Sequence, residues 1–299
     1  MRIAITGSKG MIGGLLVKKL EAKGNEVIGC DRENCDILDL EGIKKAFAGA
    51  EVVVHLAAIL DEESAQMREV NVKGTENALE AAAQSKVQQF IFLSTVGVYG
   101  STPGVKDENT NPNPETGYEK SKLEAEKKVL SYQEVFHVTI LRPALAVGKN
   151  NYWEGIIKTV KKGFPLIGSG SNSFQLVCAE DVVDAIRFCI GREECYGETF
   201  IVAEPEEGAM TLEGAVNHIR KGLGMSGPAG KIPKAAGKIL AHVNSLVKFN
   251  PILKPAYLRR MLRERSYSTA KLESLGWKAQ RTGRDGISKL VREFMTEKK

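Results

Sequence analysis

The segment IAITGSKGMIGGLLVKKL, residues 3–20, is the strongest indication of the fold class. Gly7, Gly10 and Gly13 follow a strand-like apolar run directly and open an amphipathic helical segment. Each glycine has a physical task at such a turn: a tight bend, close backbone approach to a pyrophosphate, and close packing of helix on strand. The amides and the dipole of a helix N-terminus favour an anion there. The sequence therefore predicts that this loop binds the pyrophosphate of a dinucleotide.

An acidic residue ends the next predicted strand. Asp31 closes the run NEVIGCD, where a carboxylate accepts hydrogen bonds from the ribose hydroxyls and repels a 2′-phosphate, which favours NAD. Arg32 beside it would instead attract that phosphate, so NADP stays an alternative. Asp36 has two interpretations: contact with the adenine amino group, or the N-cap of a helix over 39–48.

Outward from this loop, short β-branched runs alternate with helical segments such as 11–23 and 64–84. The expected strands are 2–6, 26–30, 51–56, 89–95 and 137–143. Near-continuous apolar strands that alternate with helices indicate a parallel sheet covered on both faces. We therefore expect an α/β fold with a doubly wound parallel sheet, a Rossmann domain, over residues 1–150.

Beyond Gly148 this alternation becomes irregular. A helix is expected over 179–190, and the end of the chain predicts a helix, a turn and a closing helix over 270–294. Short helices broken by turns are expected over 225–265, at Pro228, Pro233, Pro251 and Pro255. Residues 151–299 are thus predicted to form a smaller, mainly helical substrate-binding region. Its boundary is soft because strands can return to the main sheet.

Size and composition are those of an ordinary globular protein. The 299 residues are 42% hydrophobic and 26% charged. No apolar run approaches the about 20 residues of a membrane-spanning helix, and the N-terminus lacks a signal-peptide pattern, so we expect a cytoplasmic protein. The five cysteines include no C-x-x-C pair, which predicts reduced thiols, with Cys178 as a small core residue. No metal site is predicted.

The net charge of +5 is unevenly distributed. Residues 225–299 hold 17 Lys and Arg against 5 Asp and Glu, whereas residues 1–224 hold 25 against 32. Such a basic region can contact an anionic substrate, a membrane surface or nucleic acid. Its basic residues are interleaved with Leu, Ala and Val at helical spacing, so we favour solvated helix faces over membrane contact. It lacks the aromatic interleaving of a nucleic-acid-binding module, and no nucleic-acid partner is predicted.

The segment TGYEKSKLEAEKKV, residues 116–129, is a predicted helix with Tyr118 and Lys122 four residues apart. Such residues share a helix face, with Cβ atoms about 5–6 Å apart. Two interpretations compete: an ordinary solvated face, or a phenol whose pKa the ammonium lowers for acid–base chemistry. A bound dinucleotide carries a hydride, so the pair favours alcohol–ketone chemistry. Thr95, at the end of a buried strand, would hold the substrate oxygen.

Five motifs occur in a defined order: TGSKGMIG (6–13), HLAA (55–58), STVGVYG (94–100), YEKSK (118–122) and LRPALAVG (141–148). Together they resemble the extended short-chain dehydrogenase/reductase family, the NAD-dependent epimerase/dehydratase group. The resemblance covers residues 1–190 in order and spacing. The segments QLVCAEDVVDAI (175–186) and KLESLGW (271–277) resemble later landmarks of the family more loosely, so residues 191–299 are covered weakly. It implies a homodimer that associates through helices 64–84 and 117–134.

The resemblance also implies the roles of individual residues. Thr95 would orient the substrate oxygen, Tyr118 would act as acid and base, and Lys122 would support it. The residues expected to contact the cofactor are Gly7, Gly10, Met11, Ile12, Gly13, Asp31, Arg32, Asp36, Ile37, Leu56, Ala57, Ala58, Asn71, Tyr118, Lys122 and Pro143. Four other interpretations are structural: His55 as strand packing rather than a base, Tyr99 as turn packing, Lys120 as solvated, and Asn71, alternatively, as a brace for its helix.

The substrate prediction rests on departures from the family pattern. Leu145 stands where many nucleotide-sugar members carry an Asn, and SNSFQLV (171–177) lacks the arginine that meets a phosphate. Val96 and Gly97 follow Thr95 where sugar dehydratases place two acids. These departures favour hydride transfer with a secondary alcohol or ketone of a small, fairly apolar substrate, nearer the dihydroflavonol reductase and 3β-hydroxysteroid dehydrogenase branch.

Three alternatives stay open. The runner-up is a nucleotide-sugar 4-epimerase, which shows no net cofactor turnover. A cofactor-sensing regulator or scaffold is a non-enzyme alternative, although such proteins tend to lose the Tyr/Lys pair. The basic, apolar segment 232–265 can also line a pocket for a phosphorylated or lipid-like substrate. In that case replacing Arg259 and Arg260 with Ala raises KM and leaves NAD affinity almost unchanged.

Overall fold

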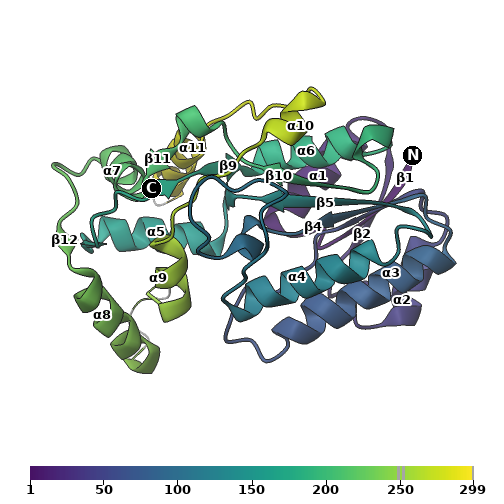
Figure 1. Ribbon diagram of the computed structural model, residues 1–299, viewed down its shortest axis with the longest axis horizontal. Coiled ribbons are helices and arrows are strands. Elements are labelled where there is room, and N and C mark those ends of the chain that lie inside the picture. Colours follow the sequence, from purple (N-terminus) through teal and green to yellow (C-terminus); the bar gives the residue numbers. More distant parts are fainter. Residues whose placement is uncertain (248–249, 251–252, 298–299) are drawn as a thin grey trace.

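A parallel sheet forms the centre of this computed structural model, in which residues 1–247, 250 and 253–297 are described. Within these residues six strands are ordered β10-β5-β4-β3-β1-β2, all pairs parallel (Figure 1). The strands are β1 (Arg2–Thr6), β2 (Glu26–Cys30), β3 (Val52–His55), β4 (Gln89–Leu93), β5 (His137–Pro143) and β10 (Glu198–Val202). The doubly wound α/β prediction is confirmed, and all five strands expected before residue 150 are present.

Helices cover both faces of the sheet (Figure 1). One face carries α1 (Met11–Glu21) and α6 (Ala179–Cys189); the other carries α2 (Leu40–Phe47), α3 (Gly74–Gln84) and α4 (Gly117–Leu130). The helix expected over 64–84 differs in detail, because a π-helical turn, Glu69–Lys73, precedes α3. π-Helical turns are frequent at functional sites.

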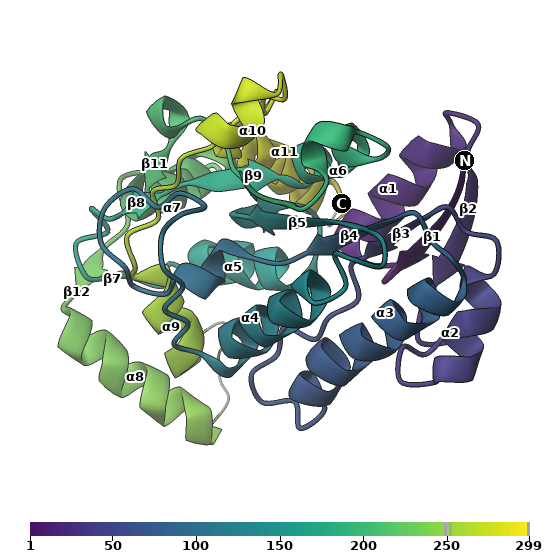
Figure 2. The same ribbon diagram turned by 45° about the vertical axis from the view of Figure 1, so that its right-hand side comes forward.

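The rest of the chain builds a second layer beyond the carboxyl ends of the strands (Figures 1 and 2). Its short strands pair as β6 (Leu145–Val147) with β9 (Leu176–Cys178), β7 (Leu166–Ile167) with β12 (Lys231–Ile232), and β8 (Ser173–Phe174) with β11 (Met210–Thr211). Its helices are α5 (Asn151–Lys161), α7 (Leu212–Gly222), α8 (Lys234–Val247), α9 (Pro255–Met261), α10 (Ala270–Ser274) and α11 (Gly283–Thr296). Short 3-10 turns occur at Val96–Tyr99, Glu193–Cys195 and Glu206–Gly208. Pro251, predicted to break a helix, lies outside the described residues.

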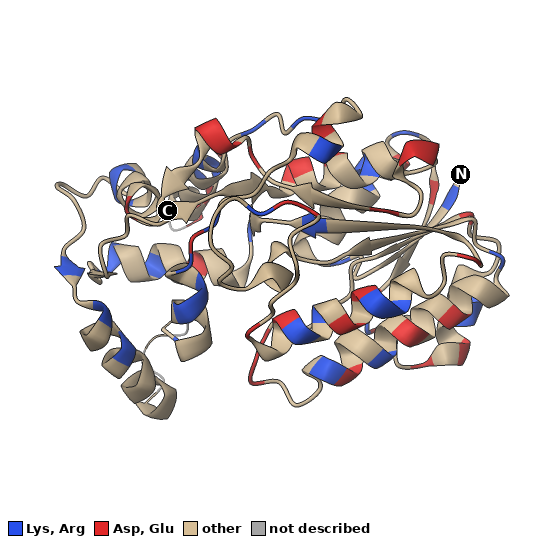
Figure 3. Ribbon diagram, viewed as in Figure 1, with Lys and Arg blue, Asp and Glu red and all other residues tan. Residues whose placement is uncertain are grey.

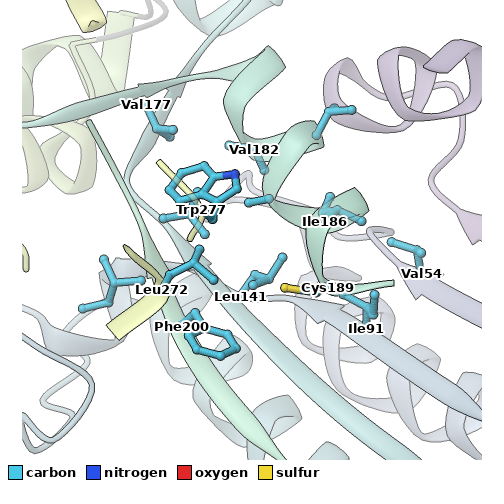
Figure 4. Packing of buried hydrophobic residues seen from close by; sticks show 14 of the residues in the cluster. Val54, Ile91, Leu141, Val177, Val182, Ile186, Cys189, Phe200, Leu272 and Trp277 are labelled. Atoms are coloured by element: carbon cyan, nitrogen blue, oxygen red, sulfur yellow. The ribbon is translucent and has the colours of Figure 1, made fainter. Parts of the chain in front are cut away.

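The two parts share one hydrophobic core. Leu272 and Trp277, from and just beyond α10, pack with Leu141 of β5 and Phe200 of β10 (Figure 4). Strand β10 itself returns to the central sheet and pairs with β5. The chain segment after residue 190 therefore supports the edge of the sheet as well as forming the second layer.

Two further expectations concern cysteines and membranes. All five cysteines fall within the described residues and are buried free thiols, Cys178 among them. Of the helices in the described ranges, none combines the length and apolar character needed to cross a bilayer.

Candidate active site

The glycine loop leaves room for a ligand because each glycine is closely approached by backbone. Gly7 has φ +68, and a β-carbon on it would lie 3.0 Å from the nitrogen of Ala57. A β-carbon on Gly13 would overlap the carbonyl oxygen of Gly7 and lie 2.8 Å from Cα of Ser8. Gly10 is the N-cap of α1, and no side chain of the described residues caps that helix. Its first-turn amides, including those of Met11 and Ile12, are therefore available to an anion.

Asp31 is held at the tip of β2 by this same loop. One of its carboxylate oxygens, Oδ2, accepts a hydrogen bond from the Ser8 hydroxyl and another, of 2.6 Å, from the Lys9 amide. The other oxygen, Oδ1, takes no part in these two bonds, so the predicted contact with the ribose hydroxyls stays open to it. The neighbouring Arg32 is exposed. The glycine loop and Asp31 therefore fit the pyrophosphate and adenosine ribose of NAD.

Asp36 does not cap a helix. Its carboxylate accepts the amide of Leu38 at 3.0 Å, within a turn, whereas the N-cap position of α2 belongs to Asp39. The N-cap interpretation is therefore wrong by three residues, because the chain makes one more turn before the helix begins. Ile37, the neighbouring residue, is buried against the β-carbon position of Gly74 on α3.

His55 is a satisfied core residue at the point where the strand order reverses between β1 and β3. Its Nδ1 is 2.8 Å from the Thr6 hydroxyl and its Nε2 is 3.0 Å from the Thr75 hydroxyl. The Thr75 hydroxyl donates to the carbonyl of Asn71, so it accepts from Nε2–H. The Thr6 hydroxyl accepts two backbone amides, so it donates to Nδ1, and the imidazole is neutral. Burial, and secondarily the charge of Lys122, lowers the pKa of His55 to about 3. It is not placed to act as a base near pH 7.

The predicted cofactor segment after β3 is fixed by two side chains. The Thr6 hydroxyl accepts the amides of Leu56 and Ala57 at 3.1 and 3.2 Å. Asn71, on the π-helical turn, bonds both backbone groups of Ile59 and donates to the Ser121 hydroxyl of α4 at 3.0 Å. Asn71 therefore ties this segment to the helix turn between Tyr118 and Lys122. It braces the site, which agrees with its structural alternative.

Thr95 sits between the sheet and the predicted catalytic helix. Its hydroxyl oxygen accepts the amide of Gly97 at 3.0 Å, which leaves the hydroxyl proton free to donate to a substrate oxygen. The preceding Ser94 is buried, and its hydroxyl has no hydrogen-bond partner within the described residues. The sequence prediction did not include Ser94.

Tyr118 and Lys122 are both buried on α4, so the solvated-face interpretation is wrong. Lys122 is 1% exposed, and its ammonium lies 4.0 Å from the centre of the Phe92 ring. Burial lowers the pKa of Lys122 to about 7, against the opposing charge of Glu126. Burial also raises the pKa of Tyr118 to about 12, and Arg260 is the cation that opposes this rise. The sequence predicts a lowered pKa for Tyr118, whereas the pKa is raised, because removal of the phenol from water outweighs the neighbouring charges.

The start of α4 is anchored by contacts that sequence reasoning missed. Thr116 and Glu119 form a capping box, a pattern visible as T-x-x-E at 116–119. Glu62, from the loop after β3, accepts the amide of Tyr118 with both carboxylate oxygens at 3.3 Å. Met67 also approaches the start of the helix. Tyr118 is thereby positioned from both its own helix and the preceding loop.

A set of arginines from the basic C-terminal region faces this helix start. Arg263 donates to Glu119 at 2.6 Å and to Glu115 at 2.9 Å, and these bonds hold the pKa of Glu119 below its ordinary value although burial opposes ionisation. The guanidinium of Arg260 lies 5.5 Å from the ring centre of Tyr118. Figures 1 and 2 both place α9, which carries Arg260, beside the N-terminal end of α4.

Arg265 differs from its neighbours because no carboxylate of the described residues pairs with it. It is buried, donates to the carbonyl of Arg260 at 2.9 Å, and stacks 4.9 Å from the ring centre of Phe174. Burial, together with the charges of Arg260 and Arg263, lowers the pKa of its guanidinium. No sequence pattern pointed to Arg265, since only the folded chain brings residues 260–265 against β8.

The remaining predicted residues have structural surroundings. Tyr99 accepts a hydrogen bond of 2.7 Å from Arg142, which forms a buried ion pair with Glu126. Lys120 is exposed, as predicted. Pro143 ends β5, and Ala58 follows Ala57 in the segment after β3.

Comparison with known proteins agrees with this arrangement. The chain is 27% identical over 328 aligned residues to a UDP-glucose 4-epimerase of Vibrio cholerae, covering 98% of this chain and 95% of that protein. It is 30% identical over 171 residues to the sterol demethylase protein B of Methylococcus capsulatus, covering 50% and 52%. The solved UDP-glucose 4-epimerase of Thermus thermophilus in complex with NAD superimposes with a TM-score of 0.78 at 25% identity, covering 99% of each chain.

The chain also matches the model of a whole protein family. Residues 3–203 match the model of the NAD dependent epimerase/dehydratase family, a span that contains the glycine loop, Thr95, Tyr118 and Lys122. The predicted dihydroflavonol reductase and 3β-hydroxysteroid dehydrogenase branch is not singled out by these matches. The match covers most of the chain, and the protein belongs to the NAD dependent epimerase/dehydratase family, within the extended short-chain dehydrogenases/reductases.

Proposed function

We propose that this protein is an NAD-dependent 4-epimerase of a sugar linked to a nucleoside diphosphate. The observation that carries the proposal is Arg265, a buried guanidinium without a carboxylate partner among the described residues. It donates to the carbonyl of Arg260, whose own guanidinium lies over the Tyr118 ring. A buried cation without an anion is costly, and a diphosphate is an anion that guanidinium groups bind well. Similarity to the 4-epimerases of Vibrio cholerae and Thermus thermophilus supports the same substrate class.

Proton transfer would be the task of Tyr118. Thr95 donates its free hydroxyl proton to the oxygen on the sugar carbon C4, and that orients the oxygen toward the phenol. Tyr118 takes the proton of the C4 hydroxyl as the ketone forms and returns it when the alcohol is restored. The pKa of about 12 in the unliganded site means that positive charge must favour the phenolate during turnover.

That positive charge would come from Arg260 and Lys122. Arg260 lies over the Tyr118 ring, and Lys122, one helix turn away, has a pKa of about 7 that an entering anion would raise. NAD, held by the glycine loop and Asp31 when it is bound, supplies the hydride acceptor and donor. Lys122 would hydrogen-bond the nicotinamide ribose and thereby fix the ring relative to Tyr118.

Inversion at C4 requires that the intermediate ketone present its other face to the same hydride. Binding through the diphosphate permits this, because the anchor lies away from the sugar and leaves the sugar free to turn. Arg265 and Arg260 hold the anchor on the side of α9. Elimination of water is not proposed, because Val96 and Gly97 follow Thr95 and no acid is placed there.

Oxidation of an apolar secondary alcohol is the second candidate. An apolar cavity of about 70 Å³ lies between α5, α9 and β7, and similarity to the sterol demethylase protein B points the same way. Its lining includes Leu258 and Leu262. Sites for small molecules measure about 300–1,000 Å³, so this cavity holds only a few atoms. The epimerase proposal is therefore the better supported of the two.

The experiment that separates them follows the cofactor and the sugar together. The protein with bound NAD is incubated with UDP-glucose and UDP-N-acetylglucosamine, and products are identified by NMR while absorbance at 340 nm reports NADH. The proposal expects 4-epimers without accumulation of NADH. Accumulation of NADH with apolar secondary alcohols, and no epimer, would favour the second candidate. Association into homodimers through α3 and α4 remains a prediction, to be checked by light scattering.

A further inference from the structure

Helix α8 differs from an ordinary surface helix, which packs its large apolar side chains against the protein. The side chains turned toward the protein are its smallest, Gly237 and Ala241, followed by Asn244. A β-carbon on Gly237 would overlap Ile167 of β7, so glycine is what lets the helix lie close. Asn244 donates to the carbonyl of Leu253 at 2.8 Å, which fixes the rotation of the helix.

Four of the five large apolar side chains of α8 point into solvent, and the fifth, Leu240, packs partly against the protein. Ile239 is 65% exposed, Val243 45%, Leu246 85% and Val247 65%. At about 100° per residue these four positions share one side of the helix, roughly opposite the buried Gly237, Ala241 and Asn244. Exposure of this apolar stripe to water is unfavourable, and such a stripe marks a surface that another partner covers.

The charges around the stripe have one sign. From residue 214 through residue 263 the sequence contains ten Lys and Arg and no Asp or Glu. Figure 3 shows basic and no acidic positions along α8. Lys234 and Lys238 are exposed on α8, and neither forms an ion pair with a carboxylate of the described residues. By contrast Lys254, beyond the helix, is paired with Asp61 and Glu63.

We infer that α8 lies on an anionic lipid surface, with Ile239, Val243, Leu246 and Val247 inserted among the acyl chains and Lys234 and Lys238 at the headgroups. An amphipathic helix with an apolar face and lysines along one side of it is the kind of element that lies in the membrane interface. Charge favours this occupant: an anionic headgroup complements both lysines, whereas a second copy of α8 carries no Asp or Glu to meet them. The helix is also accessible, since it lies at the edge of the molecule, at the opposite end from α2 and α3 (Figures 1 and 2).

The docking surface is independent of the proposed epimerase activity, because none of its residues lies among the site residues. It revises the sequence-based preference for solvated helix faces in one segment only. The sequence showed apolar and basic residues at helical spacing, but it did not show which side of α8 packs on the protein.

Vesicle co-sedimentation tests the inference with the whole chain. Vesicles of phosphatidylcholine alone are compared with vesicles containing one-third phosphatidylglycerol. We expect binding to the anionic vesicles, weakened by salt, and little binding to the neutral ones. Leu246→Gln with Ile239→Gln removes most of the inserted area and should lower the partition coefficient by at least about tenfold. Lys238→Gln should lower it by about fivefold.

Matched controls lie at and just beyond the C-terminal end of α4. Val135 is 59% exposed and Lys127 is exposed on α4, so Val135→Gln and Lys127→Gln should leave vesicle binding unchanged. All replaced side chains are exposed, and circular dichroism should show an unchanged fold. The inference is overturned if the wild-type protein binds neither vesicle, or if the double variant binds as well as wild type. A wild-type dimer that the double variant dissociates, without vesicle binding, would assign the stripe to a second copy of the chain.

Discussion

The guanidinium of Arg260 lies over the ring of Tyr118, 5.5 Å from its centre. These residues are far apart in sequence, and one belongs to the basic C-terminal region while the other begins α4. Their contact links the basic C-terminal region to Tyr118. Tyr118 carries the phenol that we propose transfers the proton. The contact gives the positive charge of residues 260–265 a local task beside the reacting oxygen.

Loss of the unpaired guanidinium should affect substrate binding more than cofactor binding. Arg265→Gln is expected to raise KM for the nucleotide sugar about tenfold or more, because a charge-assisted contact to a diphosphate is lost. The affinity for NAD, measured by fluorescence titration, should change little. Arg259→Gln is the matched control, since Arg259 is exposed and has neither contact. Equal KM values for the two variants would remove Arg265 from the substrate site.

Tyr118→Phe tests the proton-transfer step. The variant keeps the ring beneath Arg260 and loses only the hydroxyl, so folding and NAD affinity should be preserved. Turnover is expected to fall by about 10²–10⁴-fold, the usual contribution of general acid–base catalysis. Steady-state kinetics with a single nucleotide sugar provide the measurement. A variant with wild-type turnover would mean that another group moves the proton.

Two neighbouring glycines of α1 should respond in opposite ways to the same substitution. In Gly13→Ala the new methyl group overlaps the backbone of Gly7 and Ser8, which should abolish NAD binding and cost about 1–3 kcal/mol of unfolding free energy. In Gly14→Ala the methyl lies 3.7 Å from the carbonyl oxygen of Ser8, an ordinary contact. Better helix propensity should then stabilise the protein by about 1 kcal/mol. Urea unfolding and NAD titration of both variants check the pair; NAD binding by Gly13→Ala would contradict the close-approach argument.

His55 should make the stability of the fold depend on pH. Burial lowers the pKa of His55 to about 3, below the value of 6.5 expected in the unfolded chain. Between these two pH values the unfolded chain therefore binds a proton that the folded protein does not. The stabilising contribution is complete above pH 6.5 and decreases below it, by about 2 kcal/mol between pH 8 and pH 5. His55→Gln should lack this part of the pH dependence. Urea unfolding at pH 8 and pH 5 measures the difference, and equal slopes for both proteins would show that His55 does not titrate.

Sequence patterns predicted the sheet and the glycine loop because both depend on local rules. Strand runs such as 137–143 are apolar almost throughout, and Gly7 and Gly13 are required by the close approach of backbone to backbone. The burial of Tyr118 and Lys122 was not predictable from their spacing, because a charged helix face is expected to be solvated until its partners are known. Those partners, Glu62 and Arg260, come from other segments of the chain.

The proposed substrate contacts were the hardest part to predict from the sequence, because they form only in the tertiary structure. The sequence lacked an arginine in SNSFQLV, which argued against a phosphate-containing substrate. The folded chain brings Arg265 against Phe174 of that same segment, so a guanidinium reaches this place from residues almost a hundred positions later. Absence of an arginine from a local motif therefore did not mean absence of its charge from the proposed substrate site.

Retention of deuterium at C4 would show that the hydride returns to the carbon from which it left. UDP-glucose carrying deuterium at C4 is incubated with the NAD-loaded protein, and the 4-epimer is analysed by mass spectrometry while NADH is followed by absorbance. If hydride leaves and returns at the same carbon beside Tyr118, the epimer should retain the deuterium and NADH should not accumulate. An epimer that has exchanged its deuterium for solvent hydrogen, or stoichiometric release of NADH, would contradict the account.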